Sequence, residues 1–232
     1  MGKVQSVVAR ANRKLTVRFA AILIASSTLA SMLFGFLRER MLNSYYYDTY
    51  KVGLDAYTAA FILPDFMYFI LVSGALSVTF IPVFNQRLAG GNKKSAWELS
   101  TSMINLMAAA TLVASILIII FAEPLIRYII APGLSETGTA LAVSMMRVIA
   151  INPFLFAIAT VIASIQQALG KFTFFALAPS IYNLGIIVGI VFFTNGINIF
   201  GWQIFEGGIM GVALGVVLGS VMQLIVSCIG LT

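Results

Sequence analysis

Residues 99–122, LSTSMINLMAAATLVASILIIIFA, form a run without a charged side chain, and this run decides the fold class. A helix of about 20 apolar residues crosses the hydrocarbon region of a bilayer. Five other runs are of similar length and composition, so the predicted spans are residues 15–37, 56–84, 99–122, 141–169, 172–194 and 208–231. Short alternating segments, typical of a transmembrane β-barrel, do not occur. The sequence therefore predicts an all-α membrane protein, a bundle of six transmembrane helices.

The composition supports a membrane protein and excludes several kinds of chemistry. Of 232 residues, 60% are hydrophobic and 9% are charged, whereas about a quarter of a soluble domain is charged. Histidine is absent and Cys228 is the one cysteine, which excludes a histidine base, a histidine metal site and an internal disulfide. No P-loop and no nucleophile–base pair occur. We therefore expect a membrane protein without a metal or other cofactor, and not an enzyme.

The lysines and arginines predict how the bundle is oriented. Residues 1–14 form a basic tail, which we interpret as a topology signal and not as a signal peptide or a nucleic-acid contact. Residues 15–231 form the predicted six-helix unit. With the N-terminus inside, the inner side holds Lys3, Arg10, Arg13, Lys14, Arg18, Arg87, Lys93, Lys94 and Lys171. The outer side holds Arg38, Arg40, Lys51 and Arg127. This excess of basic residues inside predicts a cytoplasmic N-terminus.

Proline and glycine residues within the spans predict kinks. Pro64, Pro153 and Pro179 each remove a helical hydrogen bond, and Gly35 and Gly74 add small residues at mid-span. We consider all five as hinge or kink positions. One interpretation is a bundle that bends around a space, and the other is ordinary close packing of membrane helices through small residues.

Ionisable and amide side chains within spans are candidates for function because they are costly in lipid. Arg38 ends the first predicted span, Asp55 precedes the second, and Arg147 lies inside the fourth. Asn183 and Gln223 lie in the last two spans, where they either bond neighbouring helices or line a polar cavity. Two further acids have simpler explanations. Glu39 reaches the interface, and Asp65 caps a helix restarting after Pro64.

Six short motifs follow one another in order along the spans. They are SMLFGFLRE at 31–39, DAYTAAFILPD at 55–65, GALSVTFIPV at 74–83, APGL at 131–134, ALAPSIYN at 176–183 after Lys171-Phe172, and GSVMQL at 219–224. Together these motifs resemble the MviN/MurJ family of lipid II flippases, within the multidrug/oligosaccharidyl-lipid/polysaccharide exporter superfamily. The resemblance covers Ser31 to Leu224.

The resemblance implies a function and a larger architecture. Members of the family turn undecaprenyl-diphosphate-linked peptidoglycan precursor, lipid II, across the bacterial cytoplasmic membrane for cell-wall synthesis and cell shape. Two six-helix lobes alternate access to a cationic cavity, driven by membrane potential or an ion gradient. This chain then corresponds to the N-terminal lobe and requires a C-terminal lobe or a partner chain. Arg38 matches a cavity arginine and Asp55 a family acid, so these two residues, with Arg147, Asn183 and Gln223, are the predicted substrate-binding residues.

The sequence also departs from the family pattern. Met32 stands where the first motif has an arginine, Tyr68 and Phe69 replace an arginine pair, and Phe175 replaces a proline. Arg147 lies near the basic position of the fourth span and is expected to replace part of the lost charge. Two other functions therefore stay open. One is export of another lipid-linked oligosaccharide or of drugs, and the other is a non-transporting scaffold for cell-wall enzymes. A fragment, a split half and a truncated product all fit the length.

Overall fold

The computed structural model describes residues 16–47, 51–73, 80–199, 202–205 and 207–231. The predicted tail, 1–14, and the predicted hinge Gly74 lie outside them. In chain order the first elements are α2 (Val17–Tyr46), α3 (Lys51–Tyr68), the π-helix η1 (Phe69–Ser73), α4 (Ile81–Ala89), α5 (Lys93–Leu125) and the π-helix η3 (Ile126–Ile130). They are followed by α6 (Glu136–Ile149), α7 (Asn152–Ala168), α8 (Thr173–Val188), the π-helix η4 (Gly189–Phe193), β1 (Ile197–Ile199), β2 (Trp202–Phe205) and α9 (Met210–Ile229).

The six predicted spans are confirmed. Within the described part of the chain, six helical segments are long and apolar enough to cross a membrane: Arg18–Tyr46, Lys51–Val72, Lys93–Ile130, Glu136–Ala168, Thr173–Phe193 and Met210–Ile229. The protein is thus an all-α, multi-pass membrane bundle. A short hairpin of β1 and β2 is the one addition among the described residues, and it connects η4 to α9.

Several spans begin or end away from the predicted positions, among them the first two. The first helix continues nine residues beyond Leu37 to Tyr46, because a helix does not stop where hydropathy falls. The Tyr46 hydroxyl donates to Thr194 Oγ1 over 2.8 Å and joins this end of α2 to the end of η4. The second span begins earlier than predicted, at Lys51. Residues 74–79 lie outside the described part of the chain, and Ile81–Ala89 form α4. Arg38 therefore lies inside α2 and not at its end.

The three prolines affect their helices differently. Pro153 follows the break between α6 and α7 at Ala150–Ile151, and it occupies an early position of α7, where its missing N–H costs least. Pro64 and Pro179 lie inside α3 and α8, which continue past them. Of the three, Pro153 is the one that coincides with a helix boundary.

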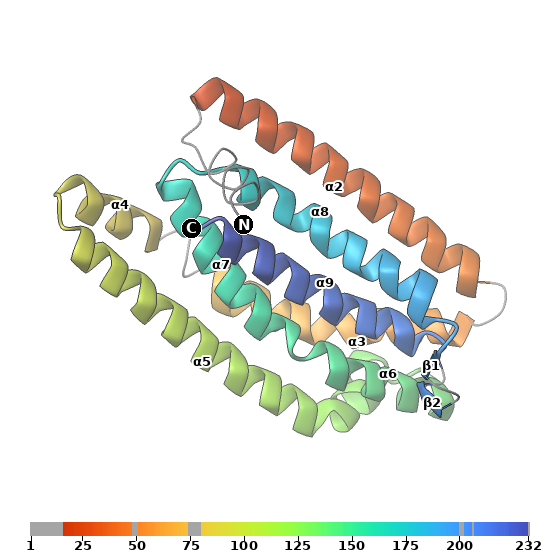
Figure 1. Ribbon diagram of the computed structural model, residues 1–232. Coiled ribbons are helices and arrows are strands. Elements are labelled where there is room, and N and C mark those ends of the chain that lie inside the picture. The colour runs from red at the N-terminus through yellow and green to blue at the C-terminus, as the bar shows by residue number, and fades with distance from the viewer. Residues whose placement is uncertain (1–15, 48–50, 74–79, 200–201, 206, 232) are drawn as a thin grey trace.

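Helices α8 and α9 lie side by side in Figure 1 and approach closely through glycines. A Cβ atom on Gly185 would lie 2.2 Å from the Gly219 Cα, and one on Gly189 would lie 2.5 Å from the Gly215 Cα. These distances leave no room for a methyl group. The backbones of the two helices are therefore in direct contact at both glycine pairs. The spacing of four residues on each helix is the small-residue pattern of membrane helix pairs.

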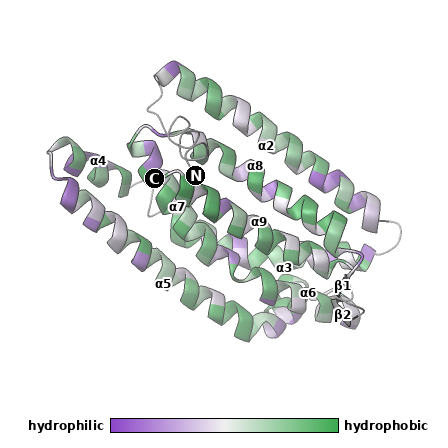
Figure 2. Cartoon of the chain, in the orientation of Figure 1, coloured by the Kyte–Doolittle hydropathy of each residue, from purple (hydrophilic) through white to green (hydrophobic). Residues whose placement is uncertain are grey.

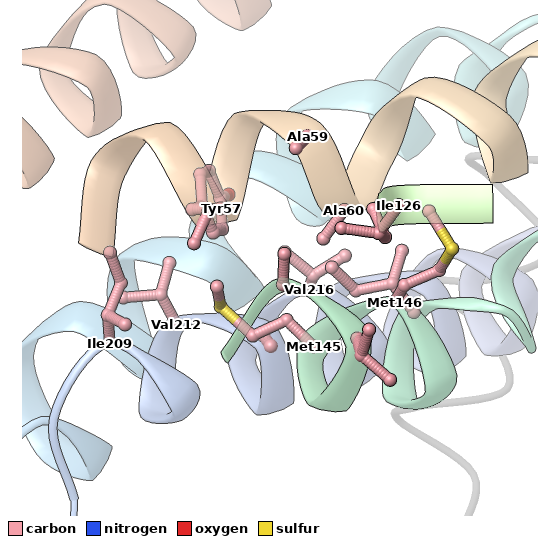
Figure 3. Packing of buried hydrophobic residues seen from close by; sticks show 14 of the residues in the cluster. Tyr57, Ala59, Ala60, Ile126, Met145, Met146, Ile209, Val212 and Val216 are labelled. Atoms are coloured by element: carbon pink, nitrogen blue, oxygen red, sulfur yellow. The ribbon is translucent and has the colours of Figure 1, made fainter. Parts of the chain in front are cut away.

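The main core lies between α3, α6, α8 and α9, where Met145, Met146 and Val216 are fully buried (Figure 3). Figure 2 shows that hydrophobic residues predominate along the helices, and many of the large apolar side chains are exposed. On α2, Phe19, Leu33 and Phe36 are each more than two-thirds exposed. An apolar exterior is unfavourable in water and favourable in lipid.

Candidate functional site

A pocket with a volume of about 620 Å³ lies between α2, α3, α7 and α8. Its lining residues come from helices distant in sequence: Arg38, Glu39, Leu42, Asn43, Leu54, Tyr57, Thr58, Phe61, Asp65, Tyr68, Phe156 and Tyr182. We call it the Arg38 pocket. Arg38 lies eight residues before the end of α2, about 12 Å along the helix axis. The pocket therefore reaches well into the membrane-spanning part of the bundle.

The guanidinium of Arg38 is held on one edge and free on another. Its Nη1 donates to Asn183 Oδ1 over 3.1 Å, and its Nη2 lies 3.7 Å from Glu39 Oε2. Its Nε is buried and has no hydrogen-bond partner among the described residues. The side chain is 28% exposed. An oriented arginine with an unused donor is suited to bind an oxyanion.

Asn183 positions Arg38 and does not itself line the pocket. Its Nδ2 donates to the Ser31 carbonyl over 3.2 Å and to the Pro179 carbonyl over 3.3 Å, so it joins α8 to α2. The predicted hinge Gly35 packs beside it, and a Cβ there would lie 3.8 Å from the Asn183 amide. The structure thus brings together the predicted residues Arg38 and Asn183, which are 145 positions apart in sequence.

Acidic and aromatic side chains complete the Arg38 pocket. Glu39 and Asp65 supply two carboxyl groups beside the single arginine. The Phe156 ring contacts both Tyr68 and Tyr182, with ring centroids 5.6 Å and 5.1 Å apart. The pocket therefore combines one cation with an excess of carboxylate and a wall of aromatic rings.

The other predicted site residues lie elsewhere. Asp55 is exposed in a neighbouring pocket between α3 and the segment after η3, which shares Thr58 with the Arg38 pocket. Gln223 lines a pocket between α7, α8 and α9 that shares Tyr68. Arg147 lines a groove between α5 and α6. In Figure 1, α2 and α5 form opposite edges of the bundle.

Sequence reasoning missed most of the α3 side of the pocket. Tyr57, Phe61, Asp65 and Tyr68 all line it, and they are spaced by four, four and three residues along α3. This is the spacing of residues on one helix face. The same periodicity was present in the sequence and indicates that Asp65 belongs to the pocket-lining face. Nothing in the sequence indicated Phe156 or Tyr182.

Comparison with known proteins identifies the family. The family model of the lipid II flippase MurJ matches residues 50–232. The chain belongs to the MurJ lipid II flippase family. A probable lipid II flippase MurJ of Bdellovibrio bacteriovorus is 30% identical over 91% of this chain and 39% of its own length. The lipid II flippase MurJ of Thermosipho africanus is 26% identical over 90% of this chain and 40% of its own length.

The match confirms the family inferred from the motifs, which is a family of transporters and not of enzymes. It includes α3 to α9, and so three of the four helices that form the Arg38 pocket. The chain spans about two fifths of the length of these curated MurJ relatives.

Proposed function

We propose that this chain is the N-terminal lobe of a flippase that carries lipid II across the bacterial cytoplasmic membrane, with its N-terminus in the cytoplasm. The observation that carries the proposal is Arg38, a cation fixed inside a membrane-spanning helix and lining the Arg38 pocket. A charge inside the membrane is costly unless a partner or substrate uses it. Membership of the MurJ family supplies the substrate class, a lipid-linked diphosphate.

The chemistry of the pocket suits a phosphate group next to a sugar. The exposed part of the Arg38 guanidinium takes phosphate oxygens, while Asn183 holds Nη1 in place. The rings of Tyr68, Phe156 and Tyr182 offer flat apolar faces with hydroxyl groups at the edges, which suit sugar rings. The lipid tail stays in the bilayer, beside the apolar exterior of the bundle.

A second lobe is part of the proposal. Because one arginine faces the two carboxyl groups of Glu39 and Asp65, the Arg38 pocket alone does not neutralise a diphosphate. We expect the C-terminal lobe, or a partner chain, to add the remaining positive charge and to close the cavity from the other side. Alternating access then follows from movement of one lobe against the other, coupled to membrane potential or an ion gradient.

Competition binding tests the substrate. We expect the purified chain to bind labelled lipid II in detergent, and unlabelled lipid II to displace it at lower concentration than undecaprenyl diphosphate without the sugar. If an undecaprenyl-diphosphate-linked oligosaccharide of another kind displaces it better, the protein exports that class of substrate. The replacement of family arginines by Met32, Tyr68 and Phe69 is the observation that favours this second candidate. If the protein binds none of these lipids but still captures cell-wall enzymes, the result supports a non-transporting scaffold.

Asp65→Asn is expected to strengthen binding of lipid II. Asp65 lines the same pocket as Arg38, and its carboxylate repels a diphosphate placed there. Removing one like charge at close range changes the binding free energy by about 1 kcal/mol, or about fivefold in affinity. The same titration with labelled lipid II measures the change. Glu98→Gln, at an exposed acid that pairs with Lys94, is the control and should leave the affinity unaltered. Weaker binding by Asp65→Asn would show that the carboxylate assists the substrate.

A further inference from the structure

A second charged groove, of about 250 Å³, lies between α5 and α6 on the outside of the bundle. It holds two arginines and two glutamates: Arg127 of η3, Arg147 of α6, Glu123 of α5 and Glu136 of α6. None of these residues lines the Arg38 pocket. We call it the Arg147 groove, and the proposed function makes no use of it.

The two arginines of the Arg147 groove differ in their partners. Arg127 is fully engaged. Its Nη1 and Nη2 donate to the two carboxylate oxygens of Glu136 over 2.9 and 3.1 Å, and Glu123 Oε1 lies 3.7 Å from Nη2. One cation thus faces two carboxylates at this end of the groove. The acidic excess there is one charge.

Arg147 has no such partner. Its Nε donates to the Ile119 carbonyl over 3.3 Å, and within the described ranges no carboxylate lies within 4.0 Å of its guanidinium. Arg147 follows Glu136 by eleven residues, which is about 16 Å along α6. Its side chain is exposed beside Ile116, Ile119 and Ile120, which are themselves at least 40% exposed. A cation lies here at the level of lipid chains, with two terminal nitrogens unused.

The order of charges along the groove matches one class of molecule. The unpaired cation lies deep, next to apolar surface, and the acidic excess lies toward the helix ends at Glu123 and Glu136. A phospholipid has the same order, because its phosphate adjoins the acyl chains and the remainder of its head extends outward. We propose that the Arg147 groove binds a phospholipid whose head carries a phosphate and a primary ammonium, as phosphatidylethanolamine does.

Each part of the groove then has a chemical role. The terminal nitrogens of Arg147 bind the phosphate, with the Ile119 carbonyl holding the guanidinium in place. The ammonium donates hydrogen bonds to Glu123, which lies four residues from Ile119, about 6 Å along α5, and retains unused carboxylate lone pairs beside Arg127. One acyl chain follows the exposed isoleucines of α5. A choline head lacks N–H donors, and a glycerol head lacks the positive charge, so both should bind less tightly.

Native mass spectrometry of the purified chain tests this proposal. Phosphatidylethanolamine, phosphatidylcholine and phosphatidylglycerol with identical acyl chains are added at equal concentration in detergent. We expect at least fivefold higher occupancy by phosphatidylethanolamine. Arg147→Gln should reduce its occupancy about tenfold, while Glu123→Gln should reduce the preference for ethanolamine over choline. Lys94→Gln, at a cation that is 89% exposed and does not line the Arg147 groove, is the control and should change neither.

A second measurement guards against a folding effect of the variants. Ligands that bind the folded state raise its melting temperature. We expect phosphatidylethanolamine to raise the melting temperature of the native chain and of Lys94→Gln, and to leave that of Arg147→Gln unchanged. Equal occupancy by the three lipids, or undiminished occupancy in a folded Arg147→Gln, overturns the proposal. Lipid II binding is assayed separately, at the Arg38 pocket. Neither of these two results therefore decides whether the protein is a lipid II flippase.

Discussion

Replacing Arg38 with alanine is expected to reduce lipid II translocation by the complete transporter about a hundredfold. In the native chain the Arg38 side chain is 28% exposed and lines the pocket, with Nη1 held by Asn183. Two charge-assisted hydrogen bonds to phosphate contribute about 3 kcal/mol together, which corresponds to about two orders of magnitude. The alanine variant also removes the pocket's cation and leaves Glu39 and Asp65 facing the substrate alone.

The measurement is movement of fluorescent lipid II between leaflets of proteoliposomes that contain this lobe joined to a second lobe. Arg38→Lys keeps the charge but loses the fork, so we expect an intermediate loss of about tenfold. Lys94→Ala, at a cation that is 89% exposed, controls for removal of positive charge in general. Translocation by Arg38→Ala within twofold of the native rate would remove Arg38 from substrate binding.

Gly189→Leu is expected to destabilise the bundle by about 3 kcal/mol or more, because overpacking of this kind forces backbones apart. A Cβ atom on Gly189 would lie 2.5 Å from the Gly215 Cα and 2.9 Å from the Gly211 carbonyl oxygen. Both are backbone atoms, so neither can move aside as the end of a flexible side chain could. Helix α9 must therefore separate from α8, and with it from the core residue Val216.

Thermal unfolding in detergent, followed by the fraction of chain that stays monodisperse, measures this effect. Gly133→Leu is the matched control, because a Cβ on Gly133 meets nothing within 4 Å. We expect a melting temperature lowered by about 6–12 °C in Gly189→Leu, at about 2–4 °C per kcal/mol for a chain of this size, and nearly unchanged in Gly133→Leu. Equal melting temperatures in the two variants would show that the α8–α9 contact does not limit stability.

The structure brings some of the predicted site residues together and places others apart. Arg38 and Asn183, both chosen from their place in spans, are hydrogen-bonded to each other. Asp65 was interpreted as a helix cap, yet it lines the Arg38 pocket. Arg147 was expected to replace a lost cavity cation and instead lines the groove between α5 and α6. Spacing to the nearest proline does not determine which way a helix face turns, and rotation about the helix axis decides it.

The helix boundaries, too, agree with the sequence prediction only in part. Hydropathy located all six spans, but it ended the first at Leu37, where the charged residues begin, although α2 continues to Tyr46. It also began the second at residue 56, although α3 begins at Lys51. Apolar composition measures the cost of burial in lipid and says little about where backbone hydrogen bonding stops.

The sequence by itself determined that this protein is a six-span membrane bundle of the MurJ family. Transfer into lipid depends on the composition of each segment alone, and the family motifs are contiguous. Only the tertiary structure decided which charges share a pocket and which glycines meet, as Arg38 meets Asn183 and Gly185 meets Gly219. These contacts join segments distant in sequence, and they depend on how each helix is rotated and packed against its neighbours.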